Sequence, residues 1–137
     1  MSESSVRQRL AAIMAADATG FSRLMQEDEQ STMAALEAAR SVFREQIESH
    51  QGRVMDMAGD SVFAVFDTAT GAVEAAHEVQ KTLNAHAREL PQERQMRFRI
   101  GVHLGDVMEK TDGTVFGDGV NIASRLESLA EPGGITV

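Results

Sequence analysis

Two segments of this sequence repeat their apolar residues at helical spacing, and each of them lies between segments typical of strands. The first is predicted as a helix from about Glu29 to His50, and Gln51-Gly52 then gives a stop signal. Its apolar stripe is Met33, Leu36, Ala39, Phe43 and Ile47. The second helix is closed by Pro91 and carries Ala72, Ala76, Val79, Leu83 and Ala87 on one stripe. Because each stripe occupies one side only, we expect each helix to cover a sheet with that side.

Four segments have the apolar content expected of strands: residues 9–16, 53–57, 61–66 and 96–109. The second and third flank Gly59-Asp60, which we predict as the tip of a hairpin. The fourth alternates apolar and polar residues, with Phe98, Ile100, Val102 and Leu104 expected on one face. The resulting order, β-α-β-β-α-β, predicts an α+β fold: a ferredoxin-like sheet with helices on one face.

The rest of the sequence adds one more helix and one more strand. A turn at 110–114 leads to a short helix predicted over about 120–129, then to a turn and a strand at 135–137. With no internal repeat or linker, we interpret residues 1–137 as one domain. The last strand begins where the sequence stops, so the order of elements is expected to be unfinished.

Charge and composition exclude several classes of function. The 137 residues carry 13 Lys and Arg against 21 Asp and Glu, and only 4% are aromatic, so a nucleic-acid partner is not expected. The absence of cysteine excludes disulfides, thiolate nucleophiles and cysteine-ligated zinc. The apolar run at 10–16 is too short to span a membrane, and Glu3 does not suit a signal peptide. We therefore expect a cytoplasmic domain without membrane contact.

Two aspartates are placed where they could share a metal. Asp17 follows the first predicted strand, and Asp60 lies at the predicted hairpin tip. If the two strands are neighbours in the sheet, both carboxylates lie at one edge. Paired carboxylates that leave room for water and substrate phosphates suit Mg²⁺ or Mn²⁺. From their spacing alone, the alternative is that Asp60 is an ordinary turn residue and Asp17 an ordinary cap.

A possible phosphate-binding turn follows the first strand, at Thr19, Gly20, Phe21 and Ser22. Such a turn can direct successive backbone N–H groups at an anion, and a helix that started there would add its dipole. The alternative is a loop in which the glycine serves only the local shape.

Asn121 and Arg125 are four residues apart on the last predicted helix, so their side chains share one face. We expect Ile122, Leu126 and Leu129 on the other face. An Asn beside an Arg can orient a ribose and offset charge that develops on phosphate oxygens in a transition state. The alternative is that both side chains only face solvent.

The motifs together resemble one family. AADATGFSRLM, GDSVFAVF, FRIGVHLGDV and VFGDGVNIASRLE, followed by AEPGGITV, occur in this order between about Arg9 and Val137. In that order they are similar to the catalytic domain of class III adenylyl and guanylyl cyclases. The pair VNIASRLE and GDSVFAVF is the most specific part of the resemblance.

The resemblance implies a site shared by two subunits of a head-to-tail homodimer. Asp17 and Asp60 correspond to the family's two metal-binding aspartates, which hold two Mg²⁺ or Mn²⁺ ions, and the backbone carbonyl of Ala18 is a further candidate ligand. Residues 19–22 correspond to the turn that wraps the phosphates. The pair that assists the transition state comes from the other subunit and corresponds to Asn121 and Arg125.

The implied reaction is intramolecular. The 3′-hydroxyl of a nucleoside triphosphate attacks its own α-phosphorus, pyrophosphate leaves, and a 3′,5′-cyclic nucleotide remains. One ion would lower the pKa of the 3′-hydroxyl and polarise the α-phosphate, and the second would neutralise the β and γ oxygens. Arg125 would meet the charge on the leaving side.

The two positions that read the base in this family are Asp56 and Thr114 here. In this family, adenylyl cyclases usually carry Lys at the first position, and guanylyl cyclases place an acid there. The second position is often Asp, although one branch of adenylyl cyclases carries Thr. A carboxylate only accepts hydrogen bonds, and guanine offers the adjacent donors N1–H and N2–H₂, so Asp56 favours guanine or a relaxed choice. Thr114 can donate or accept and decides nothing. The choice between ATP and GTP stays open, as does an Asp56 that faces solvent and reads no base.

Two other functions are compatible with the motifs. One is a catalytically weak or silent cyclase-like module that binds nucleotide or a partner subunit for regulation; the other is a different two-metal phosphoryl-transfer enzyme. The joint presence of Asp17, Asp60, Asn121 and Arg125 favours the active cyclase, since a silent copy is expected to have lost some of them. The family domain continues beyond Val137 with more strands and a late Lys that contacts the triphosphate, so we expect the C-terminal part of the domain to be absent.

Overall fold

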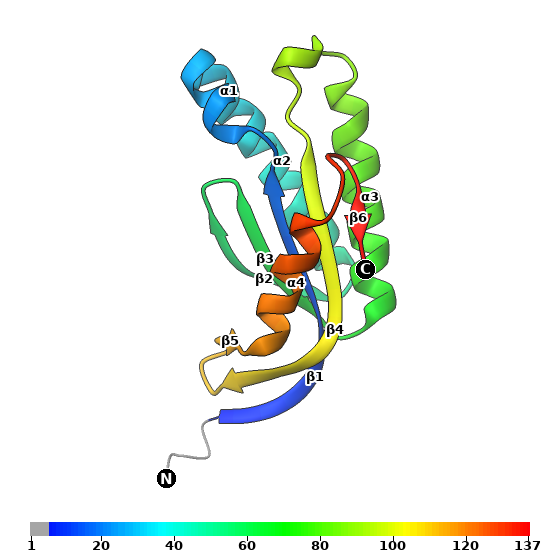
Figure 1. The fold of residues 1–137 in the computed structure, drawn as a ribbon. Helices are drawn as coiled ribbons and strands as arrows, with labels where there is room; N and C mark the ends of the chain where they lie inside the picture. Colours follow the sequence, from blue (N-terminus) through cyan, green and yellow to red (C-terminus); the bar gives the residue numbers. More distant parts are fainter. Residues whose placement is uncertain (1–5) are drawn as a thin grey trace.

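A six-stranded sheet organises the fold (Figure 1), in a computed structural model that describes residues 6–137. In chain order the elements are β1 (Val6–Ala18), α1 (Phe21–Glu27), α2 (Glu29–Ser49), β2 (Gly52–Ala58), β3 (Ser61–Phe66), α3 (Ala69–Ala87), η2 (Gln92–Arg94), β4 (Phe98–Lys110), β5 (Val115–Phe116), α4 (Asp118–Ser128) and β6 (Ile135–Thr136). None of the helices within these residues is long and apolar enough to cross a membrane.

The sheet has the predicted ferredoxin-like topology. Its strand order is β2-β3-β1-β4-β5, and β6 pairs in parallel with β4. β1 lies in the middle and pairs antiparallel with both β3 and β4. The β1–β4 ladder runs the whole length of both strands, from Val6 opposite Lys110 to Ala18 opposite Phe98. This register places Asp17 directly opposite Arg99.

Helices cover both faces of the sheet. The predicted pair, α2 and α3, packs on one face, where Met14 of β1 joins a core that includes Phe43 and Val79. The additional helix α4 packs on the opposite face, where Ile13 joins a smaller core (Figure 1). Because both faces are covered, the apolar run of β1 is buried on both sides and does not alternate.

The buried side of α2 differs from its predicted stripe at one position. Met33 is 37% exposed, and the neighbouring Thr32 is buried in its place. The Thr32 hydroxyl donates a hydrogen bond to the backbone carbonyl of Leu24 in α1, at 2.9 Å. The sequence predicted a turn at residues 19–22 and left open whether a helix starts there, so the contact between α2 and α1 was not predicted.

Two leucines predicted on apolar faces are exposed. Leu104 lies in β4 beyond its buried half and is 49% exposed, and Leu129 follows the end of α4 and is 73% exposed. The buried residues of α4 are Gly119, Ala123 and Glu127, which repeat every four positions. The prediction for Leu129 was therefore wrong, because this residue follows the end of α4 and lies four positions after the exposed Arg125, out of step with the buried residues.

Candidate active site

Asp17 and Asp60 come together at the end of β1, as predicted. The ladder between β1 and β3 ends at Ala16 opposite Val62, and the β2–β3 turn then brings Asp60 back towards β1. One carboxylate oxygen of Asp60, Oδ2, accepts a hydrogen bond from the backbone N–H of Ala18 at 3.0 Å. The two aspartates therefore lie close together at one end of the neighbouring strands β1 and β3.

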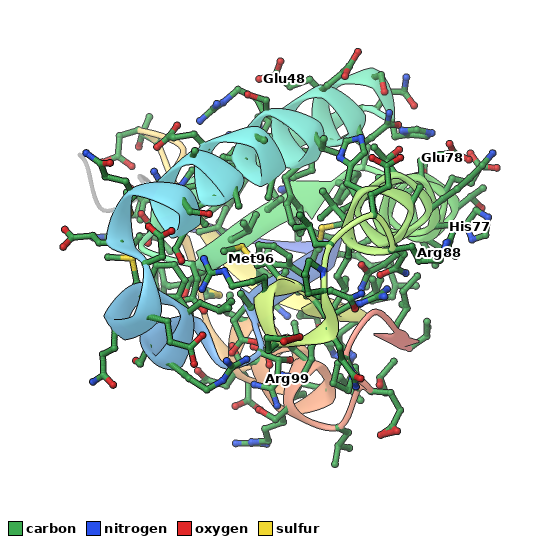
Figure 2. The ribbon with its side chains drawn as sticks, turned by 90° about the horizontal axis from the view of Figure 1, so that it is seen from above. Glu48, His77, Glu78, Arg88, Met96 and Arg99 are labelled. Atoms are coloured by element: carbon green, nitrogen blue, oxygen red, sulfur yellow. The ribbon has the colours of Figure 1, made fainter. Side chains whose placement is uncertain are left out.

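Arg99 of β4 is the partner of Asp17. Its Nε donates to Oδ1 of Asp17 at 3.1 Å, and its Nη2 donates to Oδ2 at 3.0 Å. This two-bond pairing is the arrangement in which guanidinium and carboxylate bind most strongly, and it raises the pKa of Arg99 above its ordinary value. Figure 2 shows Arg99 next to α4, on the side of the sheet away from α2 and α3.

Glu127 of α4 adds a third carboxyl group. It is 8% exposed, and its Oε2 lies 3.1 Å from Nη2 of Arg99. Burial raises the pKa of Glu127 to about 7, and the nearby negative charge of Asp17 contributes to the increase. Among residues 6–137, no cluster of three or more Asp, Glu or His side chains is arranged to hold a metal ion. A cation bound by Asp17 and Asp60 would therefore need further ligands from backbone, water or substrate.

The turn at residues 19–22 lies directly beside Asp17. Thr19 and Gly20 are exposed, and α1 begins at Phe21. Gly20 precedes the helix with a φ of 68°, in the left-handed region that glycine adopts without strain, and no side chain caps this end of α1. The backbone N–H of Thr19 donates to the carbonyl of Arg97 at 2.8 Å, which ties the turn to the segment before β4.

Asp56 and Thr114 lie at one open hollow, although they are far apart in the sequence. The hollow has a volume of about 400 Å³ and lies between β2, β3 and the turn that joins β4 to β5. Its lining also includes Arg53, Phe63 and Asp112. The structure thus brings together the two positions that the family resemblance assigned to the base.

A β-bulge in β2 directs Asp56 to this hollow. Val54 pairs with Ala64 of β3, but the next pair joins Asp56 to Phe63, so Met55 is an extra residue. Directly paired residues point to the same face of a sheet. Without the extra residue, Met55 would pair with Phe63 and Asp56 with Val62. Asp56 would then lie on the opposite side of the sheet from Phe63.

Asn121 and Arg125 lie on the exposed side of α4. In the part of the chain that the structure describes, neither side chain makes a hydrogen bond or an ion pair. The structure therefore confirms their shared exposed face but does not bring them into contact with Asp17 or Asp60.

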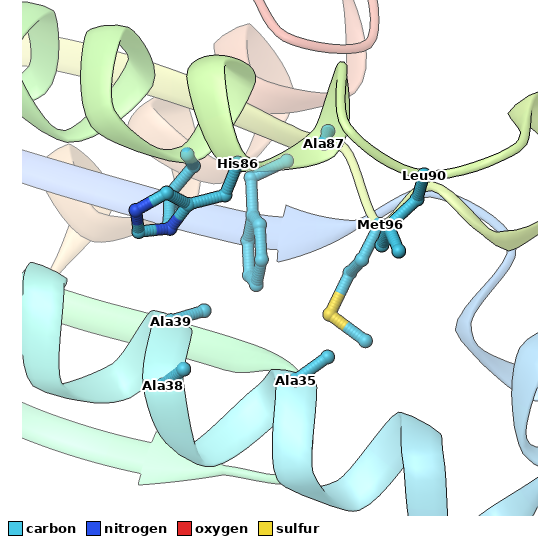
Figure 3. A pocket seen from close by; sticks show the side chains of 9 residues that line it. Ala35, Ala38, Ala39, His86, Ala87, Leu90 and Met96 are labelled. Atoms are coloured by element: carbon cyan, nitrogen blue, oxygen red, sulfur yellow. The ribbon is translucent and has the colours of Figure 1, made fainter.

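A separate pocket between α2 and α3 is unsuited to a nucleotide (Figure 3). Its volume is about 100 Å³, and its lining is apolar apart from His86. The side chains of Ala35, Leu90 and Met96 point into it (Figure 3). A triphosphate needs more space and polar or positive groups, so we place the candidate active site at the Asp17 end of the sheet.

The sequence profile of the adenylate and guanylate cyclase catalytic domain matches residues 4–137. The chain belongs to this family. Two relatives agree with the assignment to this cyclase domain. A protein named putative adenylate cyclase 3 from Rhizobium meliloti (strain 1021) is 48% identical over 138 residues, covering 100% of this chain and 23% of its own length. The adenylate cyclase of Streptomyces coelicolor is 34% identical over 136 residues, covering 98% of this chain and 34% of its own. This chain thus spans about a quarter to a third of the length of these curated relatives.

Solved structures show the same fold. The crystal structure described as an adenylate/guanylate cyclase/hydrolase from Silicibacter pomeroyi has a TM-score of 0.85 and 37% identity, over 95% of this chain and 76% of that chain. A guanylyl cyclase crystal structure has a TM-score of 0.82 at 21% identity, which is a likeness of fold alone.

Arg99 and Glu127 are the residues near the site that sequence reasoning missed. Arg99 is a polar residue in an alternating strand, and Glu127 lies at helical spacing from the buried Gly119 and Ala123. A Glu at a buried position of a helix could have indicated a polar contact inside the domain, because a buried carboxyl group needs a partner. Only the β1–β4 register shows that the partner is the Arg99 opposite Asp17.

Proposed function

We propose that this cyclase domain converts a nucleoside triphosphate into a 3′,5′-cyclic nucleotide and pyrophosphate. The 3′-oxygen forms a bond to the α-phosphorus, and the bond from that phosphorus to the oxygen bridging towards the β-phosphate breaks. The hydroxyl proton passes to solvent. The observation that carries the proposal is the convergence of Asp17 and Asp60 beside the turn at residues 19–22.

Asp17 and Asp60 fit hard divalent cations. With the backbone carbonyl of Ala18 they form an all-oxygen donor set, which Mg²⁺ and Mn²⁺ prefer. We assign two such ions to these groups. When bound, the ions supply positive charge that polarises the α-phosphate and favours loss of the 3′-hydroxyl proton. The N–H of Ala18 holds Asp60 in place by its hydrogen bond.

We assign the triphosphate to the turn at residues 19–22. The exposed Gly20 allows close approach of an anion to the backbone, and the start of α1 has no side-chain cap. The first backbone N–H groups of a helix have no partner within that helix and are available to a phosphate.

We assign the base to the hollow that holds Asp56 and Thr114. The carboxylate of Asp56 can accept hydrogen bonds from N1–H and N2–H₂ of guanine, whereas adenine offers it one donor and leaves ring N1 without a partner. GTP is therefore the preferred substrate in this proposal, and ATP is the weaker one.

The proposed active form is a head-to-tail homodimer with two sites. Asn121 and Arg125 would act on the substrate held by the partner's aspartates, which agrees with their exposure and their lack of contacts within residues 6–137. Apolar side chains are also exposed along the strands: Leu10 is 60%, Leu104 49% and Phe116 41% exposed. These three side chains lie on the neighbouring strands β1, β4 and β5, and apolar side chains that gather in one exposed patch are a feature of surfaces that another chain covers.

Removal of either carboxylate tests the proposal. Asp17→Ala and Asp60→Ala should each reduce formation of cyclic nucleotide and pyrophosphate to a few per cent of wild type or less, because each removes a metal ligand. Purified protein containing this chain is assayed with ATP and with GTP, each with Mg²⁺ and Mn²⁺. Asp67→Ala, at an exposed aspartate after β3, is the matched control and should keep full activity. Substantial activity in either site variant, or a product other than cyclic nucleotide, would contradict the proposal.

A further inference from the structure

The guanidinium of Arg99 already occupies the carboxylate of Asp17. Nε donates to Oδ1 at 3.1 Å and Nη2 donates to Oδ2 at 3.0 Å, so both potential ligand atoms of Asp17 are hydrogen-bonded to the same cation. A divalent ion that uses these oxygens must compete with a charge-assisted pair of the strongest geometry. The metal-free site is thus stabilised by a cation from within the chain.

Glu127 offers the same guanidinium a second acceptor. Its Oε2 forms an ion pair with Nη2 of Arg99 at 3.1 Å, yet among the described residues this buried oxygen has no hydrogen bond, whereas the same Nη2 donates one to Asp17. A buried carboxylate oxygen without a hydrogen bond is costly. A turn of the guanidinium from Asp17 towards Glu127 would supply this oxygen with a hydrogen bond.

The backbone holds all three residues within reach of one another. Arg99 is opposite Asp17 in the β1–β4 ladder. Glu127 is fixed by the contact of α4 with Gly101, where a Cβ atom would lie 2.5 Å from the carbonyl oxygen of Ala123. Nη1 of Arg99 also approaches the carbonyl oxygen of Ser128 on α4, at 3.5 Å. A change of partner for Arg99 therefore needs only side-chain rotation.

We propose that Arg99 is a displaceable counter-cation of the metal site, which occupies Asp17 in the metal-free protein and moves to Glu127 when a divalent ion binds Asp17. This inference rests on the proposed role of Asp17 as a metal ligand. Glu127 is a positioning residue: it acts through Arg99 and lowers the cost of releasing Asp17. Arg99 weakens metal binding, and Glu127 partly relieves that effect.

The test is a double-mutant cycle on Mn²⁺ affinity without nucleotide, measured by electron paramagnetic resonance of free Mn²⁺. Arg99→Met should tighten binding at least about tenfold, because the ion no longer displaces a charge-assisted pair. Glu127→Gln should weaken binding severalfold in the wild-type background and have little effect in Arg99→Met. Equal weakening in both backgrounds would mean that Glu127 acts by its charge alone, and the inference would be wrong.

Two controls separate this inference from the proposed function. If Asp17→Asn leaves Mn²⁺ binding unchanged, or if wild type binds none, Asp17 is no metal ligand and both proposals fail. If Asp17→Asn abolishes binding but Arg99→Met does not tighten it, only the counter-cation role is overturned.

A second measurement uses the wild-type protein, so the inference can still be tested if Arg99→Met does not fold. The Nε–H signal of Arg99 in wild-type ¹⁵N spectra, identified by its loss in Arg99→Lys, should move on addition of Mg²⁺ and not move in Asp17→Asn. A signal that stays fixed at saturating Mg²⁺ would overturn the proposal.

Discussion

Glu127 shows how a single buried residue links the site to pH. Burial and the charge of Asp17 raise its pKa to about 7 from an ordinary 4.5, while Arg99 acts in the opposite direction. The folded protein therefore holds this proton more tightly than the unfolded chain does. The resulting stabilisation is fully present below about pH 4.5 and is lost as the pH rises through about 7.

We predict that Glu127→Gln removes this pH dependence. The glutamine does not titrate, so between pH 5 and pH 8.5 the wild type should lose about 2–3 kcal/mol of unfolding free energy relative to the variant. The measurement is urea unfolding across this range, with a chelator present so that no metal binds the site. A constant difference between the two proteins would show that the folded-state pKa of Glu127 is not raised.

Asp56 determines base preference in the proposed function, and Asp56→Lys tests it. Lysine donates to adenine N1 or guanine O6 but leaves the guanine N1–H without an acceptor. The GTP/ATP ratio of kcat/KM should fall by about 10- to 100-fold, the effect of one charge-assisted hydrogen bond. Absolute rates can rise for both substrates, because a negative charge is removed near a tetra-anion, so only the ratio is diagnostic. An unchanged ratio would show that Asp56 does not read the base.

At the scale of elements, close packing of α4 on β4 positions one side of the site. α4 carries Asn121, Arg125 and Glu127, and it approaches the sheet where Gly101 has no side chain. We predict that Gly101→Ala destabilises the domain by about 3 kcal/mol or more, because its methyl group would overlap the backbone at Glu127 and Ala123. Thermal or urea unfolding measures the loss.

Gly59→Ala is the control for this prediction. Gly59 is in the left-handed region at a φ of 58° but has open space around it, so alanine there should cost only about 1 kcal/mol. Equal losses in the two variants would contradict the proposed importance of the α4 contact.

The elements that could be predicted are those in which the apolar residues of the sequence repeat on one buried face. α2 and α3 each bury one stripe of apolar residues, and their positions agree with the predicted ones. α1 could not be predicted, because it has seven residues and buries only Leu24. The bulge at Met55 was also missed, since one extra residue leaves the composition of a strand unchanged.

The same reasoning separates the parts of the candidate site. The convergence of Asp17 and Asp60 followed from two strand ends in neighbouring strands, and it needs no side-chain detail. The roles of Asp56 and Thr114 came from the family resemblance and stay predictions. Arg99 and Glu127 depend on the β1–β4 register and on the side of the sheet that α4 covers, neither of which the apolar pattern specifies.

At the scale of the whole molecule, one chain holds two groups of candidate residues that do not meet. Asp17 and Asp60 lie at the end of β1, and Asn121 and Arg125 lie on the exposed side of α4 without contacts in residues 6–137. In a head-to-tail dimer with twofold symmetry, each chain would give its aspartates to one site and its Asn–Arg pair to the other.

This arrangement predicts complementation between two inactive variants. In a mixed dimer of Asp60→Ala and Arg125→Ala chains, one site carries both substitutions and the other carries neither. Random mixing makes half of the dimers mixed, so about a quarter of the wild-type activity should return. Each variant alone should be inactive, and subunit exchange is verified separately with labelled chains. A mixture that stays inactive despite exchange would place Asp60 and Arg125 in the same chain's site. Because Arg125 lies on the exposed side of α4, that helix would then have to move to bring Arg125 to the site.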